Sequence, residues 1–126
     1  MPWNVSLLSM AAAETALDEE AELKRKATYL NAEVDYLVKE LSKIPGIKPY
    51  FSNGNYVFVD ATDAGLTGKE IVDHLFEKDN IMIKSFASFR GREGFFRIAL
   101  GTHEENVLCV QAIKRYAENR KKAKKT

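Results

Sequence analysis

The feature that most constrains this chain is a regular apolar stripe in residues 23–44. Seven apolar side chains recur there at alternating steps of four and three residues: Leu23, Ala27, Leu30, Val34, Leu37, Leu41 and Ile44. This spacing places all seven on one side of an α-helix. The stripe covers only about three heptads and strand-like segments follow it, so we expect it to pack on a protein core. A coiled coil is the alternative interpretation.

A second helix is expected before the stripe. Residues 6–17 are rich in alanine and leucine, and Ser6 carries a hydroxyl suited to capping a helix N-terminus. The acidic residues at 18–20 then favour a new helix start, because negative charge complements the positive end of the helix dipole. Pro45 and Gly46 end the long helix. We therefore expect two consecutive helices ahead of the first strand.

The rest of the chain predicts strands and shorter helices. The predicted strands are residues 47–51, 55–60, 81–86 and 95–100, and capping boxes at Thr67/Glu70 and Thr102/Glu105 open two further helices. Pro49 suits an edge strand, since proline cannot donate to a ladder. Apolar residues lie on both sides of strand 55–60, so we expect both faces of the sheet to be covered. This order indicates an α+β fold, a mainly antiparallel sheet of about four strands with helices packed on it.

Composition bounds the class of protein. The 126 residues carry a formal charge of +1, are 45% hydrophobic and include one cysteine, Cys109. We expect one domain without an intrachain disulfide and without strong attraction to nucleic acid or membrane. The basic run at 114–125 is interpreted as an ordinary helix end. No apolar run reaches the roughly 20 residues of a membrane span, so a soluble, cytoplasmic protein is expected.

Arg97 lies at the centre of the apolar strand 95–100. Side chains alternate along a strand, so Arg97 points away from the more apolar face. A guanidinium stays charged and needs an anion when water is partly excluded. Lys84, on the preceding strand, could converge with Arg97 across an antiparallel hairpin. The anion is either an internal acid such as Asp60 or the carboxylate or phosphate of a ligand.

The other reactive side chains form no complete catalytic set. His74 falls within a helix and His103 at a helix start, and neither has a second ligand at metal-binding spacing. Ordinary surface or capping roles are expected for both. Cys109 lies among apolar residues of the last helix and is expected to be packed and inert. The residues by themselves therefore predict neither a catalytic centre nor a metal site.

Five segments together resemble one family. They are Pro2-Trp3-Asn4-Val5-Ser6, Ile44-Pro45-Gly46, Ser52-Asn53-Gly54-Asn55-Tyr56-Val57-Phe58-Val59, Ile81-Met82-Ile83-Lys84, and Phe96-Arg97-Ile98-Ala99-Leu100-Gly101-Thr102-His103-Glu104-Glu105-Asn106. In this order they resemble the C-terminal small domain of pyridoxal-phosphate-dependent aminotransferases of the histidinol-phosphate aminotransferase type. Threonine-phosphate decarboxylases are close relatives. The resemblance implies the small-domain fold of fold-type I enzymes, divided into an interdomain helix at 1–17, a long helix at 18–44, a sheet-and-helix body at 45–119 and a frayed basic tail at 120–126.

The resemblance also implies roles for basic residues. In the family, the arginine of an Arg-Ile-x-x-Gly-Thr motif binds the α-carboxylate of the substrate, and Arg97 occupies that position. Lys84 stands where a basic residue, usually arginine, helps to hold the substrate's phosphate. Lysine keeps the charge but lacks the planar fork of arginine. Arg90 and Arg92, in the loop before the last strand, are expected to approach the distal group of the substrate.

The family's catalytic groups are implied to lie in another domain. Its Schiff-base lysine, pyridinium-pairing aspartate and cofactor-phosphate residues precede the Pro-Trp-Asn-Val motif, with which this sequence begins. We therefore expect pyridoxal 5'-phosphate in a full-length parent and none bound to this chain, which alone should be inactive. In the parent, an amino group would pass between an amino acid or amino-phosphate and a 2-oxo acid.

The expected partners follow from the same resemblance. They are a small amino-acid or 2-oxo-acid substrate and the cofactor-binding large domain. Exposed apolar surface makes self-association of this chain possible as well. The alternatives are a stand-alone, non-catalytic module that binds small acids or a protein partner, and a lyase similar to threonine-phosphate decarboxylase.

Overall fold

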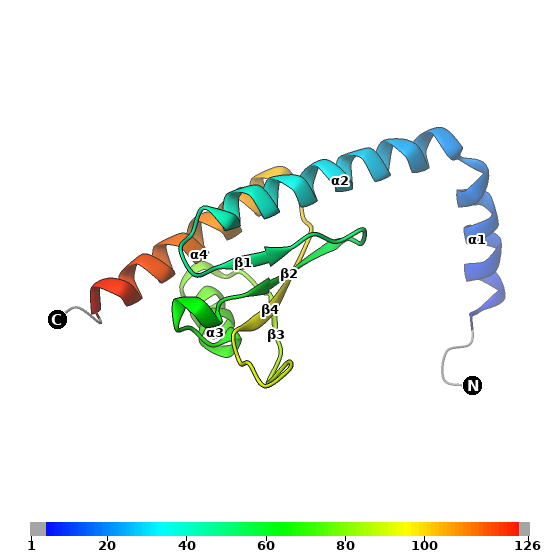
Figure 1. Ribbon diagram of the computed structural model, residues 1–126. Helices are drawn as coiled ribbons and strands as arrows, with labels where there is room; N and C mark the ends of the chain where they lie inside the picture. The colour runs from blue at the N-terminus through cyan, green and yellow to red at the C-terminus, as the bar shows by residue number, and fades with distance from the viewer. Residues whose placement is uncertain (1–4, 124–126) are drawn as a thin grey trace.

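Three helices cover one face of a four-stranded antiparallel sheet, and a fourth helix stands apart from it (Figure 1). The computed structural model describes residues 5–123. In chain order the elements are α1 (Leu7–Asp18), α2 (Glu20–Ser42), β1 (Lys48–Tyr50), β2 (Tyr56–Asp60), a 3₁₀ turn (Thr62–Ala64), α3 (Gly68–Asp79), β3 (Lys84–Ser85), β4 (Phe95–Ala99) and α4 (His103–Ala123). The strand order is β1-β2-β4-β3, with every neighbouring pair antiparallel. The predicted α+β fold is confirmed.

Hydrogen bonds at the helix starts explain where the helices begin. The Ser6 hydroxyl accepts a backbone N–H from the first turn of α1. At α3 the Thr67 N–H donates to the Glu70 carboxylate at 3.0 Å, and the Glu70 N–H donates to the Thr67 hydroxyl at 3.1 Å. Thr102 and Glu105 repeat this reciprocal pair at α4. The predicted Ser6 cap and both predicted capping boxes are confirmed.

The apolar stripe of α2 is buried only in its C-terminal half. Val34, Leu37 and Leu41 are at most 1% exposed, whereas Leu23 is 41% exposed. The N-terminal half of α2 extends beyond the sheet (Figure 1). Helix α1 is connected to that end of α2 and has no buried side chain. Packing of the stripe on a core is therefore confirmed for its second half and wrong for its first half. Helical periodicity shows which side chains share a face, but the sheet decides how much of that face it can cover.

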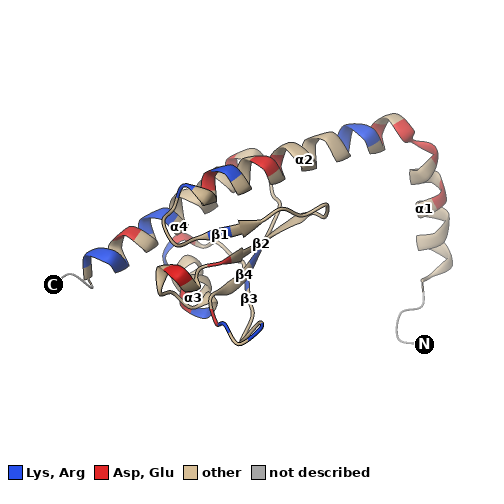
Figure 2. Ribbon diagram, in the orientation of Figure 1, with Lys and Arg blue, Asp and Glu red and all other residues tan. Residues whose placement is uncertain are grey.

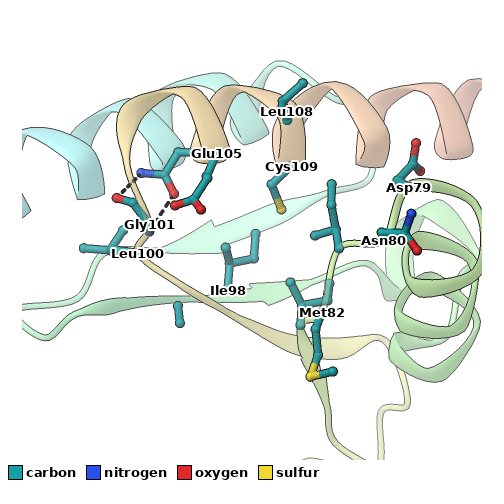
Figure 3. Close-up of a pocket in the computed structure, with 13 residues that line it drawn as sticks. Asp79, Asn80, Met82, Ile98, Leu100, Gly101, Glu105, Leu108 and Cys109 are labelled. Carbon is teal, nitrogen blue, oxygen red and sulfur yellow. Dashed lines mark hydrogen bonds between the residues drawn. The ribbon is translucent and has the colours of Figure 1, made fainter.

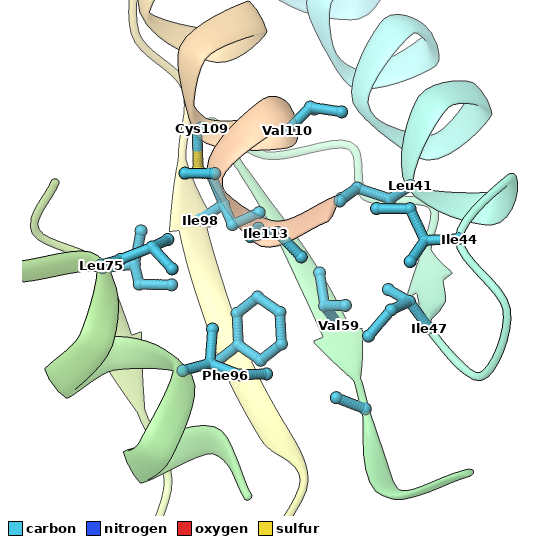
Figure 4. Packing of buried hydrophobic residues seen from close by; sticks show 14 of the residues in the cluster. Leu41, Ile44, Ile47, Val59, Leu75, Phe96, Ile98, Cys109, Val110 and Ile113 are labelled. Carbon is cyan, nitrogen blue, oxygen red and sulfur yellow. The ribbon is translucent and has the colours of Figure 1, made fainter. Parts of the chain in front are cut away.

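The core lies between the sheet and the three covering helices (Figure 4). Its central members are Leu37 and Leu41 of α2, Val57 and Val59 of β2, Leu75 of α3, Phe96 and Ile98 of β4, and Ile113 of α4. Each large apolar side chain buried in this way stabilises the fold by about 1.5–3 kcal/mol. The cluster therefore holds β2 and β4 firmly and fixes the direction of the alternate side chains, which point to the opposite face.

That opposite face carries no helix within residues 5–123, and we call it the open face. Tyr56 and Phe58 lie on it and are exposed and half-buried, whereas Val57 and Val59 on the covered face are fully buried. The prediction that both faces are covered is confirmed for the face of Val57 and Val59 and wrong for the face of Tyr56, which is 37% exposed. A strand with apolar residues on both sides does not require a helix on each face, because aromatic side chains on one face can cover one another.

Two elements differ most from their predicted bounds, each mainly at one end. The predicted strand at 81–86 is reduced to Lys84–Ser85, the two residues that pair in register with β4. Helix α4 continues to Ala123, so the frayed tail predicted from Arg120 was wrong for the described residues 120–123. The Arg120 guanidinium donates to the Glu70 carboxylate and holds the last turn on α3.

Charge is placed unevenly along the helices. Acidic residues gather where α1 meets α2, and basic residues gather at the opposite end of the molecule, in the last turns of α4 (Figure 2). Positive charge at a helix C-terminus complements the helix dipole, as expected for the basic run, of which residues 124 and 125 lie outside the described part of the chain. No helix in the described part of the chain is long and apolar enough to cross a membrane.

Candidate functional site

Arg97 and Lys84 lie side by side on the open face. Lys84 of β3 is the register partner of Arg97 in β4, and Phe58 of β2 is the partner on the other side. Residues directly opposed across an antiparallel pair have their Cβ atoms about 4.5–5.5 Å apart. The predicted convergence of the two cations is therefore confirmed.

Neither cation forms an ion pair with an acid in residues 5–123. Like charges directly opposite one another in a sheet are unfavourable, so an anion that touches both would relieve their repulsion. The Arg97 guanidinium lies over the Tyr56 ring, with Cζ 5.2 Å from the ring centroid. This cation–π contact is compatible with N–H donation from the same guanidinium to a carboxylate.

Asp60, the internal acid considered as a partner for Arg97, is engaged elsewhere. Its Oδ1 accepts hydrogen bonds from the Thr62 N–H at 2.9 Å and the Thr62 hydroxyl at 2.6 Å, and its Oδ2 lies 3.2 Å from Nη1 of Arg92. Nη2 of the same arginine donates to Asp63 at 2.6 Å. The internal ion pair of Arg97 with Asp60 is therefore not formed, and this geometry favours the ligand alternative.

Aromatic rings form a wall next to Arg97. The ring of Phe58 lies 5.0–5.4 Å from those of Phe86, Phe89 and Phe95, in edge-on and stacked arrangements. Such geometries are the favoured ones for aromatic pairs. Phe95 is buried by this contact although it points to the open face. The rings thus replace a helix layer over part of the sheet.

Two grooves meet at Arg97. The first has a volume of about 360 Å³ and is lined by Phe51, Ser52, Tyr56, Phe58, Phe86 and Arg97. The second has a volume of about 480 Å³ and is lined by Val72, Met82, Ile83, Lys84, Ser85, Arg97 and Ala99. Both volumes fall in the range of about 300–1,000 Å³ that is usual for small-molecule sites. Because Arg97 lines both grooves, it can hold the acid group of a ligand that enters either one.

The loop before β4 folds into a tight turn with Arg90 at its tip. Phe89 and Arg92 exchange backbone hydrogen bonds of 2.9 and 3.0 Å, while Arg90 and Gly91 between them have φ angles of 53° and 74°. Cζ of Arg90 lies 5.6 Å from the Phe89 ring centroid. Arg90 lines neither groove. The structure thus does not bring it to Arg97, and its contact with a substrate stays a prediction.

The remaining reactive side chains occupy structural positions. The His74 ring stacks on Tyr116 with centroids 4.3 Å apart. Burial raises the pKa of the Cys109 thiol to about 12, so the nucleophilic thiolate is scarce at neutral pH. The described residues contain no cluster of three or more side chains able to hold a metal ion. The expectation of a packed Cys109 is confirmed.

A buried polar network, which the sequence reasoning missed, fixes the end of β4. Glu33 of α2 is 5% exposed, accepts from Nδ2 of Asn106 at 2.7 Å and lies 3.0 Å from Nδ1 of His103. Oδ1 of Asn106 accepts from the Gly101 N–H at 3.1 Å. The network ties α2 and α4 to the strand that carries Arg97. Its sole signal in the sequence is a carboxylate directly beside the apolar stripe at Val34.

A separate hollow of about 380 Å³ lies between α3, β4 and α4 (Figure 3). Its charged side chains are already engaged: Asp79 pairs with Arg115 at 2.6 Å, and Glu105 caps α4. Cys109 and Ile98 supply part of its apolar wall. Because both of its charged side chains are carboxylates and it holds no cation, this hollow is a weaker candidate for an anionic ligand than the grooves at Arg97.

The sequence of this chain matches a known protein family over most of its length. The family model described as aminotransferase class I and II matches residues 1–113. The chain belongs to this family. The histidinol-phosphate aminotransferase of Thermoanaerobacter pseudethanolicus is 32% identical over 113 residues, which is 90% of this chain and 30% of that protein. The resemblance inferred from the five motifs is confirmed, although Pro2, Trp3 and Asn4 of the first motif lie outside the described residues.

Solved aminotransferase structures share the fold. The histidinol-phosphate aminotransferase from Clostridium acetobutylicum matches with a TM-score of 0.77 at 26% identity, covering 94% of this chain and 35% of that chain. The one from Sinorhizobium meliloti, in complex with pyridoxal 5'-phosphate, matches with a TM-score of 0.78 at 22% identity, covering 92% and 31%. At that identity the second match shows the fold alone. This chain therefore spans about a third of the length of these relatives.

Aminotransferases of this family use pyridoxal 5'-phosphate. A lysine that forms an imine with this cofactor has to be held in an environment that favours its neutral amine. Every lysine in residues 5–123 has an exposed side chain, and the buried carboxylate of Asp60 is engaged by Arg92. The described residues therefore do not form a site for this cofactor, and no catalytic step through it can be derived from them. They do bring two cations, Lys84 and Arg97, side by side on the open face.

Proposed function

We propose that this chain is the substrate-binding small domain of an aminotransferase similar to the histidinol-phosphate aminotransferases. The observation that carries this proposal is the pair Lys84 and Arg97, adjacent on the open face and without an ion-pair partner in the described chain. In the whole enzyme, an amino group would pass between an amino acid or amino-phosphate and a 2-oxo acid. Pyridoxal 5'-phosphate would be held by another part of that enzyme.

The two cations have different tasks in this proposal. Arg97 presents two parallel N–H donors to the α-carboxylate, and the Tyr56 ring, whose centroid lies 5.2 Å from its Cζ, helps to hold the guanidinium in place. Lys84 adds a compact charge for a second acidic group, such as the phosphate of an amino-phosphate. Both side chains bind and orient the substrate and break no bond. Orientation of this kind can account for a large share of a rate enhancement.

Helix α1 fits the proposed assembly with a cofactor-binding large domain. Its exposed apolar side chains are Leu7, Leu8, Met10 and Leu17, with 51–84% of each accessible. Several large apolar side chains exposed on one short helix usually meet a partner. We propose that α1 packs on the large domain in the whole enzyme, and that the isolated chain self-associates through it.

Binding of small acids to the isolated chain tests the role of Arg97. We expect glutamate and 2-oxoglutarate to shift the backbone NMR signals of β3 and β4, and Arg97→Gln to abolish these shifts. Arg25→Gln is the matched control, because Arg25 pairs with Glu22 on the exposed part of α2. Shifts that persist in Arg97→Gln would contradict the proposal.

A second measurement tests the separation of substrate binding from cofactor chemistry. Mixed with pyridoxal 5'-phosphate, the chain should give no stable imine absorbance band that borohydride fixes onto one particular lysine. A stable band of that kind would show that this chain has a cofactor site of its own.

A stand-alone acid-binding module is the second candidate function. It is favoured by the pair Lys84 and Arg97, whose register is set within the sheet of this chain. Such a module would bind acids as tightly without a large domain as with one. We expect instead that adding a cofactor-binding large domain of a related aminotransferase tightens acid binding; unchanged affinity together with a stable complex would favour the module.

A further inference from the structure

The hollow between α3, β4 and α4 has a chemistry opposite to that of the grooves at Arg97. We propose that it binds small aliphatic amines in their protonated form, with the ammonium group on Glu105 and the aliphatic chain along Ile98 and Cys109. This inference goes beyond the proposed function and does not depend on Arg97, which lies on the open face and does not line the hollow.

The hollow opens where the pairing of β3 with β4 stops. The pairing includes only Lys84 and Ser85 of β3. Continued toward residue 82, the same register would pair Met82 with Ala99, but no backbone hydrogen bond joins these two residues in the described chain. Both residues line the hollow instead. Its volume of about 380 Å³ falls in the range of about 300–1,000 Å³ that is usual for small-molecule sites.

Most of the wall of the hollow is apolar and none of its lining residues is aromatic. The apolar lining includes Met82, Ile83, Ile98, Leu100, Leu108 and Cys109. Met82 is 80% exposed and Leu108 is 57% exposed, so both side chains gain burial when an aliphatic chain enters. Transfer of methylene groups from water to such a wall is favourable. The wall therefore suits a flexible aliphatic chain.

The two charged side chains of the hollow are carboxylates at its opposite ends. Figure 3 shows Glu105 at one end, Asp79 with Asn80 at the other, and Ile98 between them. The charge of Asp79 is already compensated, because Nη2 of Arg115 donates to its Oδ1 at 2.6 Å. The guanidinium at that end also disfavours a second cation there. The end at Glu105 is therefore the one that suits a cation.

Glu105 keeps an uncompensated negative charge. Its Oε2 accepts the Thr102 N–H at 2.8 Å, and it forms no ion pair with a cation in residues 5–123. The N-terminus of a helix carries only about half a positive charge, whereas the first turn of α4 carries the two carboxylates of Glu104 and Glu105. The local charge is thus negative, which favours a cationic ligand.

An aliphatic ammonium ion meets both requirements of the hollow. Alkylamines resemble the lysine side chain, whose pKa is about 10.4, so they are protonated at neutral pH. The ammonium group offers three N–H donors in a compact charge, and Glu105 accepts one of them. A carboxylate on the same chain would instead be repelled by Glu105. The positions of the two carboxylates therefore set both the class of ligand and its orientation.

Four small molecules separate the effect of the charge from that of the chain. The full 126-residue chain is titrated at neutral pH with n-butylammonium, with 1-butanol, which lacks the charge, with methylammonium, which lacks the chain, and with butanoate, whose charge is opposite. Backbone NMR shifts of residues 105–109 report binding to the hollow. We expect n-butylammonium to bind there about fivefold tighter than 1-butanol, as one partly exposed ion pair allows. It should bind about tenfold tighter than methylammonium, and butanoate should leave these signals unshifted.

Variants of exposed residues assign the contacts. Glu105→Gln removes the charge and keeps the helix cap, because glutamine also serves at this position of a capping box. It should reduce the affinity for n-butylammonium to that for 1-butanol. Glu104→Gln is the matched control, since Glu104 is exposed in the same turn and does not line the hollow. Leu108→Ala should weaken both butyl ligands alike, with Leu23→Ala on α2 as the control for an exposed leucine.

Three outcomes would overturn the proposal. The first is n-butylammonium that binds no tighter than 1-butanol, or as tightly to Glu105→Gln as to the original chain. The second is an equal loss of affinity in Glu105→Gln and Glu104→Gln, which would assign binding to the general negative charge of the helix start. The third is butanoate that shifts residues 105–109 as strongly as n-butylammonium does. The proposed binding of acids at Arg97 would stand in each case.

Discussion

The two faces of one sheet have opposite chemistry in this protein. On the covered face, Val57, Val59 and Phe96 are completely buried beneath three helices. On the open face, the adjacent strand positions carry Phe58 and Arg97, which are half-buried, and next to them the exposed Lys84. Side chains of the two faces alternate along β2 and along β4. One residue along the chain therefore separates a side chain that stabilises the fold from one that is available to a ligand.

This difference shows on which face of the sheet charged side chains can remain without an ion-pair partner. Apolar side chains on the covered face gain their full burial energy within the chain, so little is left for a partner. The open face holds two neighbouring cations without an ion-pair partner in the described chain, and such a pair is unfavourable until an anion arrives. Rigid packing on one face is what permits this on the other, because the core keeps the strand register that places Lys84 beside Arg97.

Replacing one phenylalanine on each face is the strongest test of the contrast. Phe96→Ala should lower the free energy of unfolding by about 3–5 kcal/mol, because it leaves a cavity under the helices. Phe58→Ala, on the half-buried open face, should cost only about 1 kcal/mol. Urea unfolding followed by circular dichroism measures both, with Phe96→Leu as a milder variant should Phe96→Ala not fold. Equal losses would contradict the contrast.

The polar network at the end of β4 should also behave as part of the covered side. Asn106→Ala removes the amide that donates to the Glu33 carboxylate and the amide oxygen that accepts from the Gly101 N–H. The buried carboxylate then lacks one of its donors, which should lower the free energy of unfolding by about 1–3 kcal/mol. Asn53→Ala in the exposed hairpin turn is the matched control and should change stability by less than about 0.5 kcal/mol. Similar unfolding midpoints for the two variants would show that the network contributes nothing.

Stability at high pH should reveal the burial of Cys109. Its thiol has a folded-state pKa raised from 9.0 to about 12 by burial, so the unfolded chain ionises first as pH rises. The stability contributed by the neutral thiol is fully present below pH 9 and is lost progressively between pH 9 and 12. At pH 10 the loss should be on the order of 1 kcal/mol relative to Cys109→Ala, measured by denaturant unfolding at pH 7.5 and 10. Parallel pH profiles for the two proteins would rule out this effect.

The smallest effect on stability is expected at the residue that matters most for binding. Arg97→Gln should change the free energy of unfolding by less than about 0.5 kcal/mol, since it removes a repulsion with Lys84 as well as the contact with Tyr56. The same variant should lose the affinity for small acids. A loss of more than 2 kcal/mol, on the scale of about 3–5 kcal/mol that breaking a buried ion pair costs, would instead assign Arg97 a structural role.

Local sequence signals predicted most of the elements of this fold. Capping boxes at Thr67 and Thr102, and the hydroxyl of Ser6, mark helix starts because they satisfy backbone groups within a few residues. The antiparallel neighbours Lys84 and Arg97 were likewise expected to converge. Errors arose where a distant part of the chain decides the outcome. The tail at 120–123 remains helical because Arg120 reaches Glu70 of α3, fifty residues away in sequence.

The site was predicted only in part for the same reason. Arg97 and Lys84 could be found as charges inside apolar strands, but the aromatic wall depends on Phe86 and Phe89 folding back over Phe58. The loop is held there by the contact of Arg92 with Asp60. No spacing rule connects these residues. The same contact removed Asp60 as a partner of Arg97.

By itself, the sequence determined the α+β class, the alternation that puts Arg97 opposite to the core-facing Phe96, and membership of the aminotransferase family. These follow from periodicity and from ordered motifs, which are properties of neighbouring residues. Only the tertiary structure decided that half of the α2 stripe is exposed. It also decided that, within residues 5–123, one face of the sheet is open and Asp60 binds Arg92, which leaves Arg97 without an acid partner there. Burial and ion pairing are set by which distant segments meet, and that is a property of the packed chain alone.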